Sequence, residues 1–300
     1  MTLQQLKYIT KVADCASISE ASSQLFISQP SLSHSIKELE AELGFSLFLR
    51  LPKGISITTE GHIFLGYARQ VLEQYQLLEE KYLGGTPLKQ RFRVSSQHYS
   101  FAVQAFAELV TQYAHEEYEF AFHEGRTYEV IMEVATLKSE LGLLYLNDFN
   151  RKVLGNVLDE QHVQFHPLFT SQPHIFIGRE NPLAGRSSVS LEDLSPYPCL
   201  CFDQGEFNSF YYSEEILSFL PHAKVIRVSD RATIFNLMIG LNGYTISTGL
   251  LSHSLDDAQI VSIPLDVDQI IEIGYIHHRD LKPGYLATKY LERLEAVCKL

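Results

Sequence analysis

The sequence has few cysteines and no long hydrophobic run. Four cysteines in 300 residues do not make a disulfide framework, and Cys199 and Cys201 have no second Cys or His pair at zinc-like spacing. We interpret these two as buried small hydrophobic side chains. No stretch approaches the ~20 uninterrupted apolar residues of a membrane helix, and the first residues do not form a basic-then-apolar signal peptide. We therefore expect a cytoplasmic protein with no membrane partner.

Catalytic and cofactor motifs are missing as well. The chain has no Gly-rich phosphate loop of the Walker or dinucleotide type, and no Gly-x-Ser-x-Gly elbow accompanies its many serines. His162 and His166 are four residues apart, but neither a helix pattern nor a carboxylate partner accompanies them, so we expect no metal site. These absences argue against an α/β enzyme with an N-terminal helical appendage. We expect neither enzyme activity nor a cofactor.

An excess of basic residues is also lacking. The chain carries 24 Lys and Arg against 36 Asp and Glu, a formal net charge of −12. Residues 1–60 contain five basic and six acidic side chains, so their net charge is −1 and the remaining residues carry −11. Composition alone therefore does not predict nucleic-acid binding, and any DNA-binding surface must depend on a few placed cations.

Three helices are predicted in the first sixty residues. An apolar face marks a first helix near residues 3–13. Ser17 and Glu20 form the capping-box pattern, so a second, short helix should begin at Ile18. Ser28 is a suitable cap for a third helix, whose first turn tolerates the proline that follows.

The third helix has one apolar and one polar side. The apolar side chains fall within about 60° of one another at 100° per residue: Leu32, Ile36, Leu39 and Leu43. The opposite side carries small or polar residues and one cation: Pro30, Ser33, His34, Lys37 and Ala41. Serine and histidine can reach base edges, and Lys37 can meet a base edge or a phosphate. The same face also suits the solvent side of an ordinary small helical domain, so the helix alone leaves both interpretations open.

A hairpin and a long helix should follow. Two short β-prone runs, 45–50 and 55–58, flank a turn at residues 51–54. Thr58 or Thr59 should then cap a helix of roughly 24 residues. Its apolar residues recur at alternating spacings of four and three: Phe64, Ala68, Val71, Tyr75, Leu78 and Tyr82. A long helix must bury such a stripe, and we expect it to pack against a second copy of itself.

From residue 89 onward, strand-like and helical segments alternate, which predicts an α/β fold. We expect strands at residues 91–96, 118–123, 141–146, 174–178, 199–202, 224–228, 244–247 and 271–277. We expect helices at residues 101–113, 128–137, 213–220, 232–241 and 286–297. The chain is long enough for more than one core, because domains typically contain about 100–150 residues.

Contiguous motifs in the first 65 residues resemble the LysR-type transcriptional regulators. The family's recognition-helix signature is similar to Ser28-Gln29-Pro30-Ser31-Leu32-Ser33, Ile36-Lys37-Glu38-Leu39-Glu40 and Leu43-Gly44. Its wing and linker helix resemble Leu47-Phe48-Leu49-Arg50 and Thr58-Thr59-Glu60-Gly61. The rest of the chain shows weaker similarity at His166-Pro167-Leu168-Phe169 and Asn181-Pro182-Leu183-Ala184. Asn181 stands where the family usually has His, and His34 where many members have Arg.

The resemblance implies an architecture and partners. It implies an α/β protein with an N-terminal all-α winged helix-turn-helix, a long linker helix, and a two-lobed effector domain like a periplasmic binding protein. The expected boundaries are 1–58 for the DNA-binding domain, 59–88 for the linker helix and hinge, 89–163 with 267–300 for the first lobe, and 164–266 for the second. The expected partners are double-stranded promoter DNA, a small-molecule effector and further copies of the chain in a dimer or tetramer. RNA polymerase is a further candidate partner.

The resemblance also implies site residues. On the DNA side they are Gln29, Ser31, Ser33, His34 and Lys37, with Arg50 and Lys53 of the wing on the backbone or minor groove. Ser31 could equally cap its helix. On the effector side, at strand ends and helix starts, they are Ser96, Gln97, His98, Tyr99, Arg126, Thr127, Phe202, Asp203 and Asp230.

The effector-side residues indicate a class of ligand. Arg126 suits a carboxylate or phosphate, because the guanidinium fork binds such groups with two parallel hydrogen bonds. Helix N-termini at the cleft would favour negative charge in the same way. We therefore expect a small polar, anionic metabolite. The alternative is a small-molecule-binding α/β protein whose helical N-terminal domain does not bind DNA.

Overall fold

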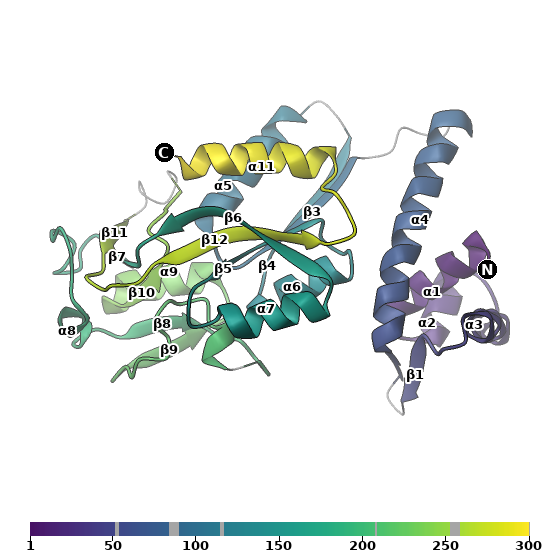
Figure 1. Cartoon of the computed structure of the whole chain (residues 1–300), viewed down its shortest axis with the longest axis horizontal. Coiled ribbons are helices and arrows are strands. Elements are labelled where there is room, and N and C mark those ends of the chain that lie inside the picture. The colour runs from purple at the N-terminus through teal and green to yellow at the C-terminus, as the bar shows by residue number, and fades with distance from the viewer. Residues whose placement is uncertain (52–53, 84–89, 115–116, 208, 253–258, 300) are drawn as a thin grey trace. The chain divides into compact units, whose positions relative to one another are not determined.

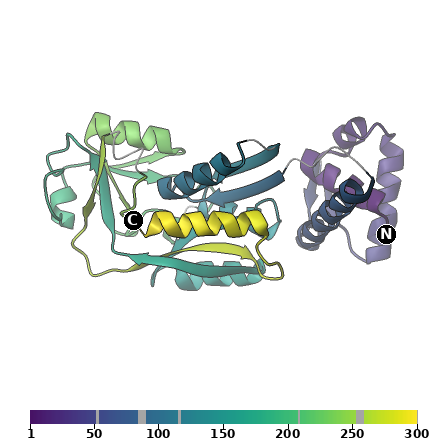
Figure 2. The ribbon, with the colours of Figure 1, turned by 90° about the horizontal axis from the view of Figure 1, so that it is seen from above.

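The chain divides into two compact units, residues 1–89 and 90–300 (Figures 1 and 2). The structure is a computed structural model, and it describes residues 1–51, 54–83, 90–114, 117–207, 209–252 and 259–299. Within these ranges, no helix is long and apolar enough to cross a membrane.

The first unit is helical with one small hairpin. Its elements are α1 (Leu3–Cys15), α2 (Ile18–Gln24), α3 (Gln29–Leu43), β1 (Phe48–Leu51), β2 (Gly54–Ile57) and α4 (Thr59–Leu83). Hydroxyl oxygens fix the helix starts, because they accept hydrogen bonds from amides that have no partner inside the helix. Ser17 accepts from the amide of Glu20, and Ser28 accepts from the amide of Ser31. The predicted starts of α2 and α3 are confirmed, although the Glu20 carboxylate accepts from Gln24 instead of completing a capping box.

The apolar stripe of α3 is buried as predicted, except that Leu43 at the end of the helix is half-buried. Leu32 and Leu39 have no exposed surface, and Ile36 is also buried. They pack with Leu6 and Ile9 of α1 in the core of the unit. Burying such a side chain contributes roughly 1.5–3 kcal/mol, so the stripe determines which face of α3 remains in solvent.

The hairpin is attached to α3 through Glu40. Its Oε1 accepts hydrogen bonds from the amides of Leu47 (2.7 Å) and Phe48 (3.1 Å), where β1 begins. Gly61, in the first turn of α4, leaves no room for a side chain, because a Cβ there would collide with the Leu47 carbonyl oxygen. The Leu-Phe-Leu-Arg and Thr-Thr-Glu-Gly motifs therefore meet at one point of the fold.

The apolar stripe on α4 differs in register from the prediction. Ala68 is buried and, with Phe64, packs against the core of its own unit. Among the described side chains of α4, the large apolar ones left exposed are Ile63 (47%), Tyr67 (44%), Val71 (47%) and Leu78 (58%). The prediction was wrong for Phe64 and Ala68, because the same helix must also cover α1. The side chain of Tyr82 lies outside the described residues.

The second unit contains two five-stranded sheets, one in each lobe. The first has the order β4-β3-β5-β12-β6, from β3 (Gln90–Ser96), β4 (Tyr118–Glu124), β5 (Leu141–Leu146), β6 (Val163–Ser171) and β12 (Ile271–His278). The second has the order β11-β7-β10-β8-β9, from β7 (His174–Gly178), β8 (Cys199–Phe202), β9 (Val225–Val228), β10 (Tyr244–Ser247) and β11 (Ile260–Pro264). In the first sheet β3 is parallel to β4 and β5. In the second, β8 is parallel to β9 and β10.

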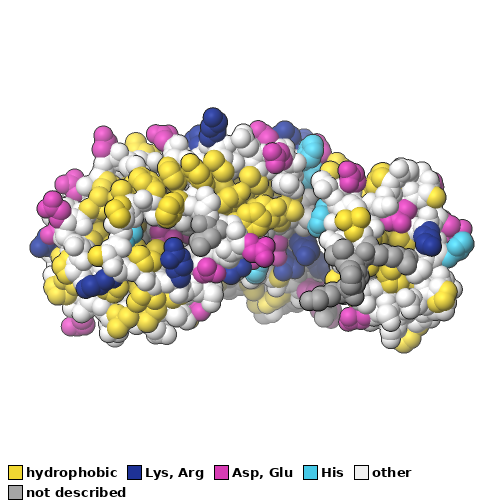
Figure 3. Space-filling view, turned by 90° about the horizontal axis from the view of Figure 1, so that it is seen from below, with side chains coloured by type: hydrophobic (Ala, Val, Ile, Leu, Met, Phe, Trp, Pro, Cys, Tyr) yellow, Lys and Arg dark blue, Asp and Glu magenta, His cyan; other side chains and the backbone are white. Residues whose placement is uncertain are grey.

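Helices cover both faces of the first sheet. On one face α5 (Ser100–Gln112) and α11 (Tyr285–Cys298) lie side by side, and on the other lie α6 (Thr127–Ala135) and α7 (Arg151–Glu160) (Figure 1). In the second lobe, α9 (Arg231–Leu241) packs against β7 and β8. The short helices α8 (Leu191–Leu194) and η1 (Phe210–Tyr212) complete the described helices of this unit. Hydrophobic side chains also remain exposed here, and Figure 3 shows many of them in yellow on one face.

Three parts of the second unit differ from the prediction. β6 pairs with β12 in the first sheet, so the first lobe reaches Ser171 instead of ending at residue 163. The helix α7 and the strand β11 were not expected. Residues 213–220, predicted as a helix, form turns and bends, and Leu217 has a left-handed φ of 64°. Ile216 and Leu217 are buried in this irregular segment, so burial without helical periodicity explains its apolar pattern.

Candidate DNA-binding and effector-binding sites

The exposed face of α3 carries the residues predicted to meet DNA. Gln29, Ser31, His34 and Lys37 are exposed, and Ser33 is half-buried. The opposite face of the helix is buried in the core, so these side chains point into solvent. A DNA major groove, about 12 Å wide, admits an α-helix of this kind.

Two contacts on this face involve predicted residues. The Ser31 and Ser28 hydroxyl oxygens are 2.8 Å apart, so Ser31 takes part in the cap of α3. His34 Nε2 lies 3.2 Å from Glu38 Oε1, and both side chains are largely exposed. Lys37 has no ion-pair partner among the residues that the structure describes, which leaves its ammonium group available for a phosphate or a base.

The wing residues are only partly described. Arg50 lies opposite Ile55 in the antiparallel pairing of β1 with β2. Its side chain is outside the described residues, as is the whole of Lys53. Their contact with DNA stays a prediction.

Each lobe of the second unit contains a point where the order of the parallel strands reverses. β3 lies between β4 and β5, and β8 lies between β9 and β10. Ligands of open α/β sheets bind outside the carboxyl ends of the strands at such a point. β3 ends just before His98 and β8 ends at Phe202, and both residues line one cavity between the lobes.

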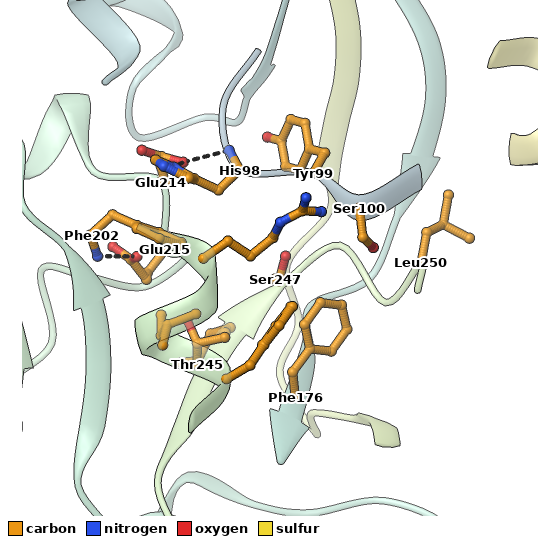
Figure 4. Close-up of a pocket in the computed structure, with 14 residues that line it drawn as sticks. His98, Tyr99, Ser100, Phe176, Phe202, Glu214, Glu215, Thr245, Ser247 and Leu250 are labelled. Atoms are coloured by element: carbon orange, nitrogen blue, oxygen red, sulfur yellow. Dashed lines mark hydrogen bonds and ion pairs between the residues drawn. The ribbon is translucent and has the colours of Figure 1, made fainter. Parts of the chain in front are cut away.

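The cavity between the lobes is small (Figure 4). Its volume is about 30 Å³, and its polar lining comes from both lobes: His98, Tyr99, Ser100, Glu214, Glu215, Arg231, Thr245 and Ser247. A space of this size holds about one water molecule. A metabolite therefore cannot occupy it unless the surrounding side chains move.

A wider groove adjoins this cavity. It has a volume of about 820 Å³ and shares Ser100, Arg231 and Phe235 with the cavity. Volumes of roughly 300–1,000 Å³ are typical of small-molecule sites. Asp230 lines this groove, where its carboxylate caps α9 by accepting from the amide of Thr233 at 2.8 Å.

A segment of the second lobe closes one side of the cleft. It consists of residues 203–207 and 209–215, which we call the plug segment. Arg126 Nη2 donates to Asp203 Oδ2 (2.9 Å), and Arg126 Nε donates to the Asp203 carbonyl oxygen (3.0 Å). Gly205 permits this approach, because a Cβ there would lie 2.6 Å from Arg126 Nη1.

Further bonds join the plug segment to the first lobe. The Thr127 amide donates to Gln204 Oε1 (3.1 Å), and Thr127 Oγ1 donates to the Tyr212 carbonyl oxygen (2.7 Å). Tyr145 OH donates to the Ser213 carbonyl oxygen (3.0 Å). Two ring pairs stack across the same boundary: Tyr128 with Phe207 (3.7 Å between centroids) and Phe149 with Tyr211 (4.7 Å). The lobes are thus held together in a closed arrangement by the chain itself.

Gln97 supports the strand ends of the first lobe and does not line the cavity. It is fully buried, and its Nε2 donates to Thr127 Oγ1 (2.6 Å). Its Oε1 accepts from Tyr99 OH (2.7 Å) and from the Tyr145 amide (3.2 Å). Ser96 is also fully buried, and its hydroxyl donates to the Gln97 carbonyl oxygen.

The predicted effector residues therefore fall into separate groups. His98, Tyr99 and Phe202 line the cavity, and Asp230 lines the groove. Arg126 and Thr127 bond to the plug segment, to which Asp203 belongs, while Ser96 and Gln97 are fully buried and do not line the cavity.

Sequence reasoning missed six of the eight polar residues of the cavity: Ser100, Glu214, Glu215, Arg231, Thr245 and Ser247. Arg231 directly follows Asp230 at the start of α9, and Ser247 ends β10. Glu214 and Glu215 fell inside a segment predicted as a helix. The signal available for them was a pair of acids between two apolar runs, which is unusual for a segment that becomes buried.

Buried charge concentrates around this cavity. Burial lowers the pKa of His98, but the charge of Glu214 and the hydrogen bond to it prevail, so that the pKa of His98 is raised. Burial, followed by the charge of Glu214, raises the pKa of Glu215 well above its ordinary range. Burial also raises the pKa of Glu124, against the opposing charge of Arg231, whose Nε lies 3.3 Å from Glu124 Oε1.

Two family models match the chain. One, described as bacterial regulatory helix-turn-helix protein of the lysR family, matches residues 3–62. The other, described as LysR substrate binding domain, matches residues 87–299. Together they cover both units.

Individual proteins are similar over most of this chain. The transcriptional regulator MetR of Escherichia coli K12 is 26% identical over 203 residues, which cover 67% of this chain but only 60% of MetR. A full-length OxyR variant from Pseudomonas aeruginosa is 20% identical, with a TM-score of 0.63 over 100% of this chain and 95% of OxyR. CbnR in complex with its target DNA is 18% identical, with a TM-score of 0.54 over 99% of this chain and 100% of CbnR. At these identities the two structures establish the likeness of the fold.

Proposed function

This chain belongs to the LysR family of bacterial regulatory helix-turn-helix proteins, and we propose that it regulates transcription by binding double-stranded DNA through α3 and the wing. A small polar, anionic metabolite bound between the two lobes of the second unit would control that binding. The expected location of such a regulator is the cytoplasm, beside the DNA it reads.

The exposed face of α3 carries this proposal. Its small polar side chains allow the helix to approach base edges, and Lys37 supplies a cation with no ion-pair partner among the described residues. The similar CbnR was solved with its target DNA, which supports the same role for this face. Gln29, Ser31, Ser33 and His34 would then face the DNA beside Lys37.

The exposed stripe of α4 supports self-association. Ile63, Tyr67, Val71 and Leu78 leave a line of apolar surface on a 25-residue helix. Pairing two copies of α4 would bury this line and bring two recognition helices onto neighbouring half-sites. We propose a dimer through α4, with a tetramer formed through the second units.

The cleft between the lobes supports control by a metabolite. Arg231 lines both the cavity and the wider groove, and His98 carries a raised pKa beside them. The guanidinium of Arg231 would bind an anionic group of the ligand in exchange for its contact with Glu124, although Glu124 and Asp230 also line the groove. Ligand binding would shift the population between closed and open lobes, and so change the spacing of the paired DNA-binding units.

The test is DNA binding by the full chain, measured by fluorescence anisotropy on the intergenic DNA beside its own gene. Lys37→Ala should weaken binding about ten-fold, and the affinity of the wild type should fall steeply as salt is raised. Lys138→Ala removes the same charge from an exposed residue of the second unit, and it should leave DNA affinity unchanged. Equal losses in both variants would contradict the assignment of α3.

The same DNA-binding measurement also tests the alternative function, a small-molecule-binding protein that does not bind DNA. If the full chain has no measurable DNA affinity at low salt but still binds small molecules, it is a small-molecule-binding protein whose first unit no longer reads DNA. A thermal-shift screen of carboxylates and phosphates would detect such binding.

A further inference from the structure

One side chain of the plug segment reaches the centre of the cleft. Glu214 Oε2 accepts hydrogen bonds from the backbone amide of His98 (2.9 Å) and from the imidazole Nδ1 of the same residue (2.8 Å) (Figure 4). Its other oxygen, Oε1, accepts from Gln204 Nε2 (3.0 Å). The side chains of Glu214 and His98 are 5% and 6% exposed. The carboxylate is therefore buried, and it accepts hydrogen bonds from three donors, two of which belong to the other lobe.

His98 is built to receive a carboxylate at this point. Its ring stacks on Phe202 with 3.8 Å between centroids and 5° between planes, which fixes the direction of Nδ1. Its backbone amide lies two residues before α5, which begins at Ser100, and the N-cap residue Tyr99 makes no side-chain capping bond. The imidazole, the amide and the start of the helix thus all favour a negative group in one position.

Glu214 comes from a part of the chain that can withdraw without unfolding a regular element. Apart from η1, the described residues between β8 and β9 contain no helix or strand. The two bonds that Glu214 makes to the other lobe both go to His98, 116 positions away in the chain, and they are not part of the backbone pairing of a helix or strand. Withdrawal would therefore exchange side-chain and loop contacts only.

The cavity is nearly full while Glu214 is in place. Its volume of about 30 Å³ accommodates about one water molecule, whereas the adjoining groove of about 820 Å³ is large enough for a metabolite. A ligand that enters from the groove reaches His98 only if Glu214 leaves. The incoming group must offer an acceptor to the amide and the Nδ1 of His98, which Glu214 satisfies in the closed arrangement, and the nearby start of α5 favours negative charge in that group.

We infer that the Glu214 carboxylate occupies the carboxylate subsite of the effector site, and that the effector is a carboxylate-bearing metabolite that replaces Glu214 on His98. The inference rests on the proposed function, because it takes the cleft as the effector site. In the absence of the effector the chain supplies its own carboxylate and keeps the lobes closed. When the effector binds, it makes the same bonds to His98 and releases the plug segment from the first lobe.

Acetate tests this inference in the full chain. Glu214→Ala removes Cγ and the carboxylate, a fragment the size of acetate, and leaves a vacancy beside His98. Acetate should fill it and raise the midpoint of thermal unfolding of the variant by about 3 °C at ten times its dissociation constant. The wild type should respond to sodium acetate no more than to sodium chloride, because Glu214 already occupies the subsite.

Two controls distinguish this subsite from cavity filling in general. Glu215→Ala removes the same fragment from the neighbouring residue, whose Oε1 accepts from the Phe202 amide (2.7 Å) and not from His98. The double variant Glu214→Ala with His98→Phe removes the imidazole. Both should respond to acetate much less than Glu214→Ala. An equal response in Glu215→Ala, or no response in Glu214→Ala, overturns the inference.

A second variant covers the case in which Glu214→Ala does not fold. Glu214→Gln keeps the size of the side chain and loses its charge, so acetate should compete for His98 more easily. The imidazole NMR signals of His98 should shift at roughly ten-fold lower acetate concentration than in the wild type, as expected for loss of a charge-assisted bond of about 1.4 kcal/mol. Equal concentrations in the two proteins overturn the inference. If the wild type binds DNA and both acetate tests fail, only this inference falls; a wild type without DNA affinity counts against the proposed function instead.

Discussion

The exposed face of α3 and the cleft of the second unit hold their polar side chains in opposite ways. On α3, Gln29 and Lys37 extend into solvent. In the cleft, Gln97, Thr127 and Glu214 are buried, and each is bonded to other parts of the chain. The first arrangement is ready for a large partner that brings its own polar groups. The second is already satisfied, so a small ligand must exchange its bonds for those that the chain makes with itself.

The largest expected difference in stability is between alanine variants of two glutamines, Gln97 in the cleft and Gln29 on α3. Gln97→Ala should lower the free energy of unfolding of the second unit by about 2–4 kcal/mol, because it leaves Tyr99 OH, the Tyr145 amide and Thr127 without their buried partner. Gln29→Ala, the same substitution on the exposed face of α3, should change the stability of the first unit by less than about 0.5 kcal/mol. Denaturant unfolding followed separately for the two units measures both. Equal losses would remove the distinction between the two surfaces.

The next largest difference in stability is between variants of two His–Glu pairs, one buried in the cleft and one exposed on α3. His98 and Glu214 are almost completely buried, whereas His34 and Glu38 are 75% and 57% exposed. Because the folded pKa of His98 is raised, its stabilisation is complete below its ordinary pKa of about 6.5 and is lost as the pH rises through the raised value. Glu214→Gln should therefore cost about 1–2 kcal/mol near pH 6 and clearly less near pH 9.

Glu38→Gln is the matched exposed variant. Water screens an exposed pair, and such pairs contribute little to stability, so this variant should unfold like the wild type at both pH values. Unfolding free energies measured across this pH range provide the comparison. A cost of Glu214→Gln that stays constant with pH would show that the charge of His98 is not involved.

The smallest expected effect comes from Arg126→Ala. Arg126 and Asp203 are 38% and 37% exposed, and partly exposed ion pairs contribute about 0.5 kcal/mol. The variant should loosen the plug segment with little loss of overall stability, which faster hydrogen exchange in residues 203–207 would detect. If Arg126→Ala lowered the free energy of unfolding as much as Gln97→Ala, the Arg126–Asp203 pair, and not the buried bonds of Gln97, would hold the lobes together.

The sequence predicted the first unit better than the second unit's site. Ser17 and Ser28 mark helix starts through local bonds, and the stripe from Leu32 to Leu39 follows helical periodicity, so both can be recognised within a few residues. The apolar stripe of α4 was predicted with the wrong residues, because Ala68 packs against the core of the first unit. Periodicity shows that a helix has an apolar face but not which neighbour covers it.

The cleft depends on contacts that no local pattern contains. Glu214 meets His98 across 116 residues, and Arg126 meets Asp203 across 77. Strand ends and helix starts were sufficient to find His98 and Phe202. The acids of the plug segment were not found, because their segment is irregular and its apolar residues resemble a helix face.

Hydrogen exchange of the full chain, with and without its intergenic DNA, distinguishes DNA binding through α3 from binding elsewhere on the chain. DNA should slow exchange in the turn before α3 and at the start of that helix, residues 25–34, and in the hairpin that follows it. Exchange at the cleft of the second unit would then change only through coupling to the first unit, and by less. Protection confined to residues 90–300, with none in α3, would show that α3 does not bind this DNA.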